Sequence, residues 1–259
     1  MTRVTTTTTD LWHHYGRARA AQDHAVPDSF RWAWDQQDGP GPEVLGDLTG
    51  KTVADLGAGA ARHAAHLAVH HAPNRIDAVD ASPAQHSTAT ALYNDLAPHL
   101  HFVHADVVAH LRANPGAYDV LYSHFGAVDF TDPRELLPAA ADALRPGGRL
   151  VFSTLAHYLS GKPAQPDVAA VEVPAKTPEG ESATMHRWVL QEHVWTKVLD
   201  QAGFTDIRVE ALPAGDGPRT AATLLVTSAP PPETGPGNAA ASGRVSWASG
   251  PRCVRVRVS

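Results

Sequence analysis

The first residues whose types and spacing could do chemistry form a glycine turn. Asp55, Gly57 and Gly59 follow a short apolar run and open a helical pattern. Glycine lets a backbone turn tightly and approach a ligand where a Cβ atom would clash, and a helix start offers unpaired N–H groups. Asp80 ends the next predicted strand, 21 residues after Gly59, where such carboxylates bind ribose hydroxyls. This spacing predicts a site for a nucleoside-containing ligand.

Two side chains at the turn indicate which nucleoside it binds. Arg62 stands where a dinucleotide fingerprint needs its third glycine, which disfavours a nicotinamide cofactor. Asp55 leads into the turn, and an acid there suits a ligand with a positive centre and an amino group. These residues favour S-adenosylmethionine, with a nicotinamide oxidoreductase as an open alternative.

Histidines supply the candidate general bases, because the reference pKa of imidazole is about 6.5. His124 lies at the carboxyl end of a predicted parallel strand, where open α/β sheets bind ligands. His157 follows the next predicted strand, and His193 stands beside Glu192 at a helix start. Each of the three is also compatible with an ordinary capping or packing role.

No metal site is predicted. His63, His66 and His70 share one arc of a helix, but that helix has no cysteine or carboxylate to complete a ligand set. We therefore expect these three histidines to form a solvated helix face.

The elements that must position these residues alternate between strand and helix patterns. Strands are predicted at 51–59, 75–82, 99–106, 117–126, 146–155, 204–210 and 221–229. Helices are predicted at 61–71, 83–96, 107–114, 133–145 and 193–203. The alternation predicts an α/β, Rossmann-like, doubly wound, seven-stranded sheet with helices on both faces. Because only a turn separates the last two strands, we expect an antiparallel C-terminal strand in a mostly parallel sheet.

Amino-acid composition indicates which classes of partner and which cellular compartment to expect. The 259 residues are 43% hydrophobic, and 21 basic against 27 acidic side chains give a net charge of −6, which argues against a nucleic-acid partner. No apolar run reaches membrane-spanning length and the N-terminus does not resemble a secretory leader, so we expect no membrane partner. A single cysteine, Cys253, fits a cytoplasmic protein.

Shifts in composition divide the chain. Residues 1–44 carry aromatic clusters and are predicted to form a helical lid, and residues 45–229 form the ligand-binding domain. Residues 156–191 are too long for an ordinary connection and are predicted to cover the substrate, with an added strand near 185–190. Residues 230–259 open with a Pro- and Gly-rich run that predicts disorder. Trp32 and Trp34 either line an acceptor pocket or pack the lid on the sheet.

Five motifs over residues 45–229 resemble the class I S-adenosylmethionine-dependent methyltransferases, in particular their actinobacterial small-molecule branch. The motifs, in order, are VADLGAGAARHAAHLA, VDAS, FVHADV, YDVLYSHFG and LRPGGRLVFST. The resemblance implies that Asp80 binds both ribose hydroxyls, that Asp106 bonds the adenine amino group and that Val107 packs near the ring. Ser123 and His124 would then face the methyl group. The other implied cofactor contacts are Tyr15 of the lid, Asp55, Gly57, Gly59 and Ala81.

The family resemblance also implies an activity. It predicts transfer of a methyl group from S-adenosylmethionine to an oxygen or nitrogen atom, with carbon left open, of a small-molecule acceptor in natural-product metabolism. An S-adenosylmethionine-binding protein with isomerase- or cyclase-like activity is the alternative, and the oligomeric state stays open. Ala61 stands where the family often has glycine, and we expect alanine to be tolerated if that residue is helical.

Overall fold

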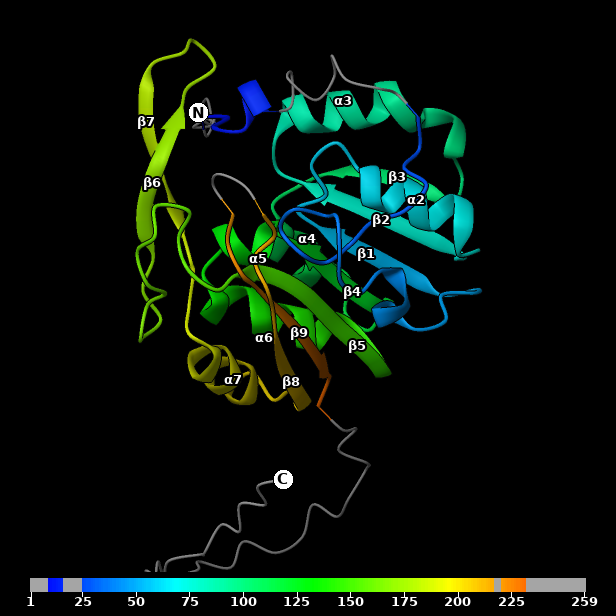
Figure 1. The fold of residues 1–259 in the computed structure, drawn as a ribbon. Coiled ribbons are helices and arrows are strands. Elements are labelled where there is room, and N and C mark those ends of the chain that lie inside the picture. Colours follow the sequence, from blue (N-terminus) through cyan, green and yellow to red (C-terminus); the bar gives the residue numbers. More distant parts are fainter. Residues whose placement is uncertain (1–8, 16–24, 217–219, 232–259) are drawn as a thin grey trace, which may run out of the picture.

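The computed structural model describes residues 9–15, 25–216 and 220–231, so the tail predicted at 230–259 lies outside the described residues from 232 onward. Its centre is a seven-stranded sheet of order β3-β2-β1-β4-β5-β9-β8 (Figure 1). The strands are β1 Thr52–Leu56, β2 Arg75–Asp80, β3 Leu100–His104, β4 Tyr118–His124, β5 Leu144–Leu155, β8 Thr205–Leu212 and β9 Thr223–Ala229. β9 runs antiparallel to both of its neighbours, while the β3-to-β5 pairs are parallel. The predicted topology is therefore confirmed.

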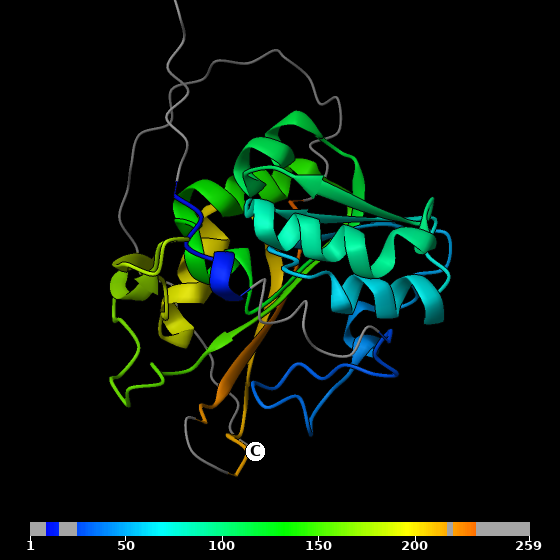
Figure 2. The ribbon, with the colours of Figure 1, turned by 90° about the horizontal axis from the view of Figure 1, so that it is seen from above.

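Helices cover both faces of the sheet, as predicted (Figure 2). The helices are α2 Arg62–His70, α3 Pro83–Tyr93, α4 Val107–Ala113, α5 Ala127–Phe130, α6 Pro133–Ala143 and α7 Glu192–Gln201, with short 3-10 turns η1 Pro42–Leu45 and η2 Asn94–Leu96. Alternate strand residues divide between two cores, since side chains along a strand point to opposite faces. Val53 and Tyr122 pack with α2 and α3, whereas Leu56 and Phe152 pack with α4, α6 and α7.

Local capping sequences fix where the helices begin at the carboxyl edge of the sheet. The Ser82 hydroxyl accepts a hydrogen bond from Gln85 N–H, and Pro83 occupies the first helical position of α3. Asp106 caps α4 in the same way through Ala109 N–H. Such caps satisfy donors that a helix start leaves unpaired, so both helices start directly after their strands.

The predicted helical lid is described only in part: residues 13–15 are helical, and residues 16–24 lie outside the described residues. Described residues 25–41 form no helix, yet Phe30 and Trp32 are fully buried in the α2-side core. Trp32 Nε1–H donates to the Gly41 carbonyl at 2.8 Å, which favours the packing role that the sequence left open for this tryptophan. His66 is buried beneath the same segment and lies 2.7 Å from the Pro27 carbonyl oxygen. The expectation of a solvated histidine face is therefore wrong for His66, because a distant segment covers it.

The insertion at 156–191 contains a separate hairpin of β6 Val171–Lys176 and β7 Ser182–Arg187. A strand does form near the predicted position, although it ends at Arg187. The Arg187 guanidinium bonds the fully buried carboxylate of Asp129 through Nη2 at 2.6 Å and Nε at 3.2 Å. Trp188 N–H also donates to the Asp129 carbonyl at 2.7 Å. These bonds tie the hairpin to α5, which directly follows β4.

We expect Arg187→Met to cost about 3–5 kcal/mol of unfolding free energy at pH 8, because it leaves the Asp129 carboxylate buried without a cation. Burial already raises the pKa of Asp129, and Arg187 opposes that rise. Without Arg187 the carboxyl group binds a proton more readily in the folded state, so the loss should shrink at pH 5.

Urea unfolding at the two pH values measures both effects. Arg134→Met is the matched control, since Arg134 pairs with Asp132 at the surface and should contribute only about 0–1 kcal/mol. An Arg187→Met loss that equals the control, or that does not change with pH, would contradict this account.

Candidate functional site

The glycine turn after β1 lies between the end of β2 and the start of α5. Gly57 has φ +80°, and a Cβ atom there would stand 2.2 Å from the Ala127 nitrogen, so no other residue fits without moving backbone. Gly57 N–H donates to the Val79 carbonyl at 2.9 Å. Gly59 has φ +56°. Ala61 is left-handed at φ 58° rather than helical, so the condition under which we expected alanine to be tolerated is not met.

Asp80 joins the glycine turn to the first turn of α3. Its Oδ2 accepts the Gly59 N–H at 2.8 Å, and its Oδ1 accepts the Ser82 N–H at 2.8 Å. Burial raises the pKa of Asp80, while the two backbone donors act in the opposite direction. Each carboxylate oxygen has a further lone pair for a hydroxyl donor. Ala81, beside it, is exposed.

Asp55 is buried just before the turn. Tyr122 of β4 donates its hydroxyl to Asp55 Oδ2 at 2.8 Å. Burial raises the pKa of Asp55 to about 7, with Tyr122 lowering it and Asp80 raising it further. Near neutral pH this carboxyl group can therefore take either form, and a nearby cation would favour the carboxylate.

The end of β3 presents Asp106 and Val107. Asp106 is exposed, and its Oδ1 accepts the Ala109 N–H at 2.9 Å. Its Oδ2 makes no hydrogen bond within the described part of the chain and stays available to a ligand. Val107 is buried against the α4-side core.

The end of β4 carries Ser123 and His124, the two residues that we expected to face the methyl group. Ser123 is fully buried and donates its hydroxyl to the Leu56 carbonyl at 2.8 Å, so this hydroxyl joins β4 to β1. His124 Nε2 lies 2.8 Å from the Arg31 carbonyl, and because a carbonyl only accepts, Nε2 carries the proton. Burial lowers the pKa of His124 to about 4. At neutral pH the ring is uncharged and holds the N-terminal segment.

The other two candidate bases lie elsewhere. His157 is half-buried within the insertion, with Nδ1 3.1 Å from the Tyr158 carbonyl. His193 is exposed in the first turn of α7, and α7 covers the face of the sheet opposite Phe30. Neither residue makes a hydrogen bond to Asp55 or His124 in the described ranges.

Residues 9–15 lie across this edge between α3 and the β6–β7 hairpin (Figure 1). Asp10 Oδ2 accepts the Ala84 N–H of α3 at 3.3 Å. The charge of Asp10 also raises the pKa of Asp80, which indicates that the two carboxylates are near each other. The segment therefore reaches the corner where the ribose of a nucleoside is expected.

Residues 9–15, which form a cover over this edge, also contact α5 and the hairpin. The Trp12 ring lies 4.6 Å from the Phe130 ring of α5, and His14 Nε2 lies 2.8 Å from the Thr177 carbonyl in the hairpin loop. Tyr15 contacts Trp12 at 6.1 Å and is 54% exposed, so it lies at the outer side of the cover.

Sequence reasoning missed three residues at the site: Asp10, Gln85 and Tyr122. Tyr122 follows the strand alternation of its motif, so the side chain that faces Asp55 was open to inference once β1 and β4 were paired. Gln85 is 2% exposed, and its Oε1 has no hydrogen-bond partner in the described ranges. Asp10 lies in a Thr-rich stretch with no pattern that would mark it.

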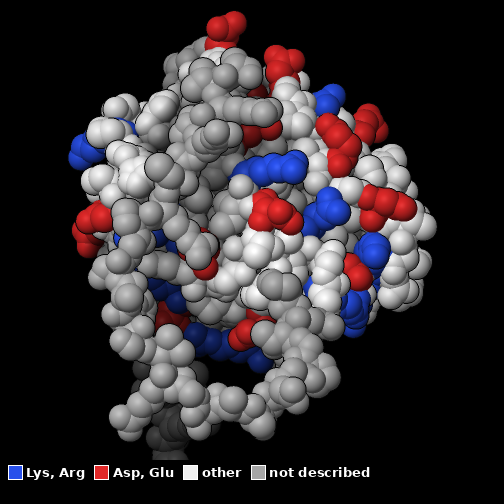
Figure 3. All heavy atoms as spheres, turned by 90° about the horizontal axis from the view of Figure 1, so that it is seen from below, with Lys and Arg blue, Asp and Glu red and all other residues white. Residues whose placement is uncertain are grey.

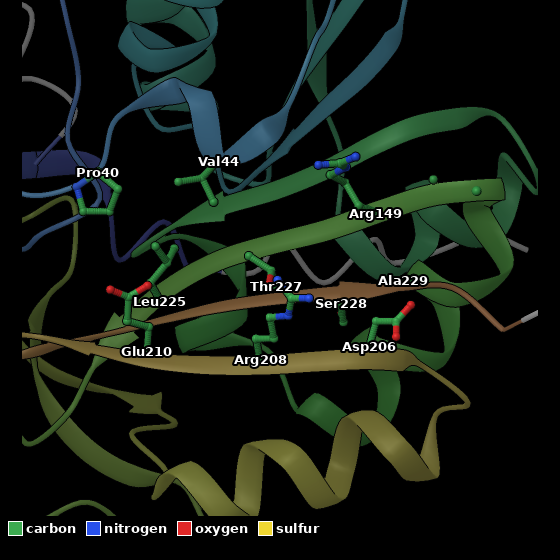
Figure 4. Close-up of a pocket in the computed structure, with 12 residues that line it drawn as sticks. Pro40, Val44, Arg149, Asp206, Arg208, Glu210, Leu225, Thr227, Ser228 and Ala229 are labelled. Atoms are coloured by element: carbon green, nitrogen blue, oxygen red, sulfur yellow. The ribbon is translucent and has the colours of Figure 1, made fainter. Parts of the chain in front are cut away.

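The described surface outside this site has a groove and charged side chains of both signs. A groove of about 630 Å³ lies over β5, β8 and β9, lined by residues such as Arg149, Arg208 and Glu210, and by none of the predicted site residues (Figure 4). On the face shown in Figure 3, basic and acidic side chains are mixed. The described residues contain no group of three or more metal-binding side chains, and no described helix could span a membrane.

Sequence comparisons identify the central segment. Residues 53–148 match the methyltransferase domain family. Ubiquinone biosynthesis O-methyltransferases from Pectobacterium carotovorum subsp. carotovorum and Cronobacter sakazakii are 33% identical over 108 residues and 32% identical over 113 residues. These matches cover 42% and 44% of this chain, and 44% and 46% of those proteins. The matched part is thus less than half the length of either relative.

Solved structures agree on the fold. An S-adenosylmethionine-dependent methyltransferase from Listeria monocytogenes has a TM-score of 0.56 at 17% identity, covering 73% of this chain and 94% of its own. The DhpI–SAH complex has a TM-score of 0.57 at 19% identity, and the match covers 86% of this chain and 97% of that one. A Burkholderia thailandensis 1,6-didemethyltoxoflavin-N1-methyltransferase has a TM-score of 0.54 at 18% identity, and the match covers 85% of this chain and 84% of that one. Residues 53–148 are thus similar to a methyltransferase domain, and the described chain has the Rossmann-like fold of these S-adenosylmethionine-dependent methyltransferases.

Proposed function

We propose that this chain is an S-adenosylmethionine-dependent methyltransferase that methylates an oxygen or nitrogen atom of a small-molecule acceptor. The observation that carries the proposal is the Asp80 carboxylate, fixed by Gly59 and Ser82 at the carboxyl end of β2 beside the buried acid Asp55. The methyltransferase domain match over the same residues supports it.

The residues present fit the cofactor. The turn at Gly57 has no room for a Cβ atom, Asp80 has lone pairs for a vicinal diol, and Asp55 suits an ammonium group. When bound, S-adenosylmethionine supplies a methyl group already activated on a sulfonium. The protein's own task is then to bind and orient, with Asp80 at the ribose, Asp106 at the adenine amino group and Asp55 at the amine.

The acceptor side is formed by aromatic side chains from separate segments. Trp12 and Phe130 contact each other at 4.6 Å, and Trp34 and Phe125 at 5.0 Å. Arg187 Cζ lies 5.1 Å from the Phe130 ring and 5.9 Å from the Trp34 ring, between the two pairs. We infer that these rings orient an acceptor and exclude water, which keeps the predicted covering roles of the N-terminal segment and the insertion.

The predicted bases change in this proposal. His124 is a weak base because its pKa is low, so it is not assigned as the general base. Its ring instead anchors the N-terminal segment through the Arg31 carbonyl. His157 and His193 have no assigned role in this proposal, since neither makes a hydrogen bond or ring contact with these residues within the described ranges. The names of the curated relatives favour an oxygen acceptor, while the Burkholderia neighbour is named for nitrogen. Natural-product metabolism and a cytoplasmic location stay predictions from the sequence.

S-adenosylhomocysteine should raise the midpoint of thermal unfolding by a few degrees, since a ligand at 100 times its Kd contributes about 2.7 kcal/mol. Asp80→Ala should remove most of this shift by deleting the ribose anchor. Asp206→Ala, which changes an acid in the distant groove, is the control and should keep it. Equal shifts in all three proteins would contradict the assigned ribose anchor, and no shift in the folded wild type would contradict the proposed cofactor.

Cofactor affinity should also depend on pH through Asp55. With a pKa of about 7, this carboxyl group is mostly charged at pH 8 and mostly protonated at pH 6, so S-adenosylhomocysteine should bind about 10-fold more weakly at pH 6. Asp55→Asn should bind weakly at both values.

The same group affects stability without ligand. Because the folded-state pKa is raised, Asp55 costs unfolding free energy progressively as pH rises from about 4 to about 7. Cofactor-free Asp55→Asn should therefore be more stable than wild type at pH 8, with the difference falling toward zero at pH 4. Calorimetry tests both statements, and a wild-type affinity that is flat between pH 6 and pH 8 would contradict the role of Asp55.

A further inference from the structure

Gln85 places a buried polar group against the glycine turn. Its side chain is 2% exposed, and its Oε1 has no hydrogen-bond partner in the described ranges. A Cβ atom built on Gly59 would lie 3.7 Å from Gln85 Oε1 and 4.0 Å from Nε2, so the carboxamide lies flat against this glycine. An unsatisfied buried acceptor destabilises a fold, and an apolar side chain of similar size would avoid that cost.

The capping turn of α3 fixes Gln85 and Asp80 relative to each other. Ser82 donates its N–H to Asp80 Oδ1 at 2.8 Å, and its hydroxyl accepts the Gln85 N–H at 3.1 Å. Gly59 in turn donates to Asp80 Oδ2. The carboxylate, the glycine and the carboxamide thus occupy one corner between β1, β2 and α3.

The chemistry of this corner points to a donor that the described protein lacks. Both Asp80 oxygens already accept a backbone N–H, so part of their capacity is used. A vicinal diol brings two O–H donors, and an amide oxygen is an acceptor with two lone pairs. A hydroxyl that reached Gln85 Oε1 would satisfy the orphaned atom and relieve the demand on Asp80.

We infer that Gln85 is a second ribose ligand, accepting a hydrogen bond from one hydroxyl of the diol while Asp80 accepts from the other. The inference rests on the proposed function, since it takes the ligand to be S-adenosylmethionine or its product. Gln85 then contributes to the choice of a ribonucleoside over a deoxyribonucleoside, at a cost in the stability of the ligand-free protein.

Gln85→Leu separates binding from folding. We expect the Kd for S-adenosylhomocysteine to rise about 10-fold, as for loss of one hydrogen bond to a buried group. The midpoint of unfolding without ligand should be unchanged or higher, because the variant removes an unsatisfied acceptor. Gln201→Leu makes the same chemical change at the exposed end of α7 and should leave the Kd unchanged.

The 2′-deoxy and 3′-deoxy derivatives of S-adenosylhomocysteine identify the hydroxyl. Wild type should bind the derivative that lacks the Gln85-bonded hydroxyl more weakly, and Gln85→Leu should bind that derivative about as well as wild type does. Equal weakening of all three ligands would show an indirect effect through Gly59 and overturn the inference, as would an unchanged Kd for S-adenosylhomocysteine.

The outcomes also distinguish a failure of the proposed function from a failure of the inference about Gln85. If folded wild type does not bind S-adenosylhomocysteine, the proposed function fails and the inference fails with it. If wild type binds but Gln85→Leu binds equally well, only the inference fails. Should Gln85→Leu not fold, Gln85→Met serves in the same assays, and loss of folding in both variants would assign Gln85 a structural role and overturn the inference.

Discussion

The rest of the site depends on the two hydrogen bonds that the Asp80 carboxylate accepts from the backbone. β1 and β2 pair in parallel with Leu56 opposite Val79, so the glycine turn emerges beside the end of β2. There the Asp80 oxygens accept one N–H from that turn and one from the start of α3. Two connections that leave the sheet separately are thereby held at a fixed separation, which is what a ligand spanning both of them requires.

Two buried acids, Asp55 and Asp129, and the partly buried Asp80 show how the surroundings of a carboxyl group decide its role. Burial raises the pKa of Asp55, Asp80 and Asp129 alike, but the partners differ. Asp129 has the cation Arg187 and serves as an anchor for the hairpin. Asp80 has backbone donors, which fix its position and leave lone pairs for a ligand. Among the described residues, the Tyr122 hydroxyl is the one hydrogen-bond partner of the Asp55 side chain, so the charge of Asp55 is the most open to change when a cation binds.

Much of the fold could be predicted because its signals are local. Strand and helix periods, the capping residues Ser82 and Asp106, and the spacing from Gly59 to Asp80 all lie within short stretches of sequence. Contacts with distant segments could not be predicted in this way. His124 bonds Arg31, 93 residues away, and His66 bonds Pro27, 39 residues away, through a segment without regular periodicity. Gln85 could not be recognised either, since an unsatisfied acceptor is visible only once its surroundings are known.

The most direct measurement is a crystal structure of the protein with S-adenosylhomocysteine. We expect the ribose at the corner of Gly59, Asp80 and Gln85, with the adenine toward Asp106 and residues 9–15 covering the ligand. A ligand in the groove over β5, β8 and β9, or a ribose that makes no contact with Asp80, would contradict this expectation.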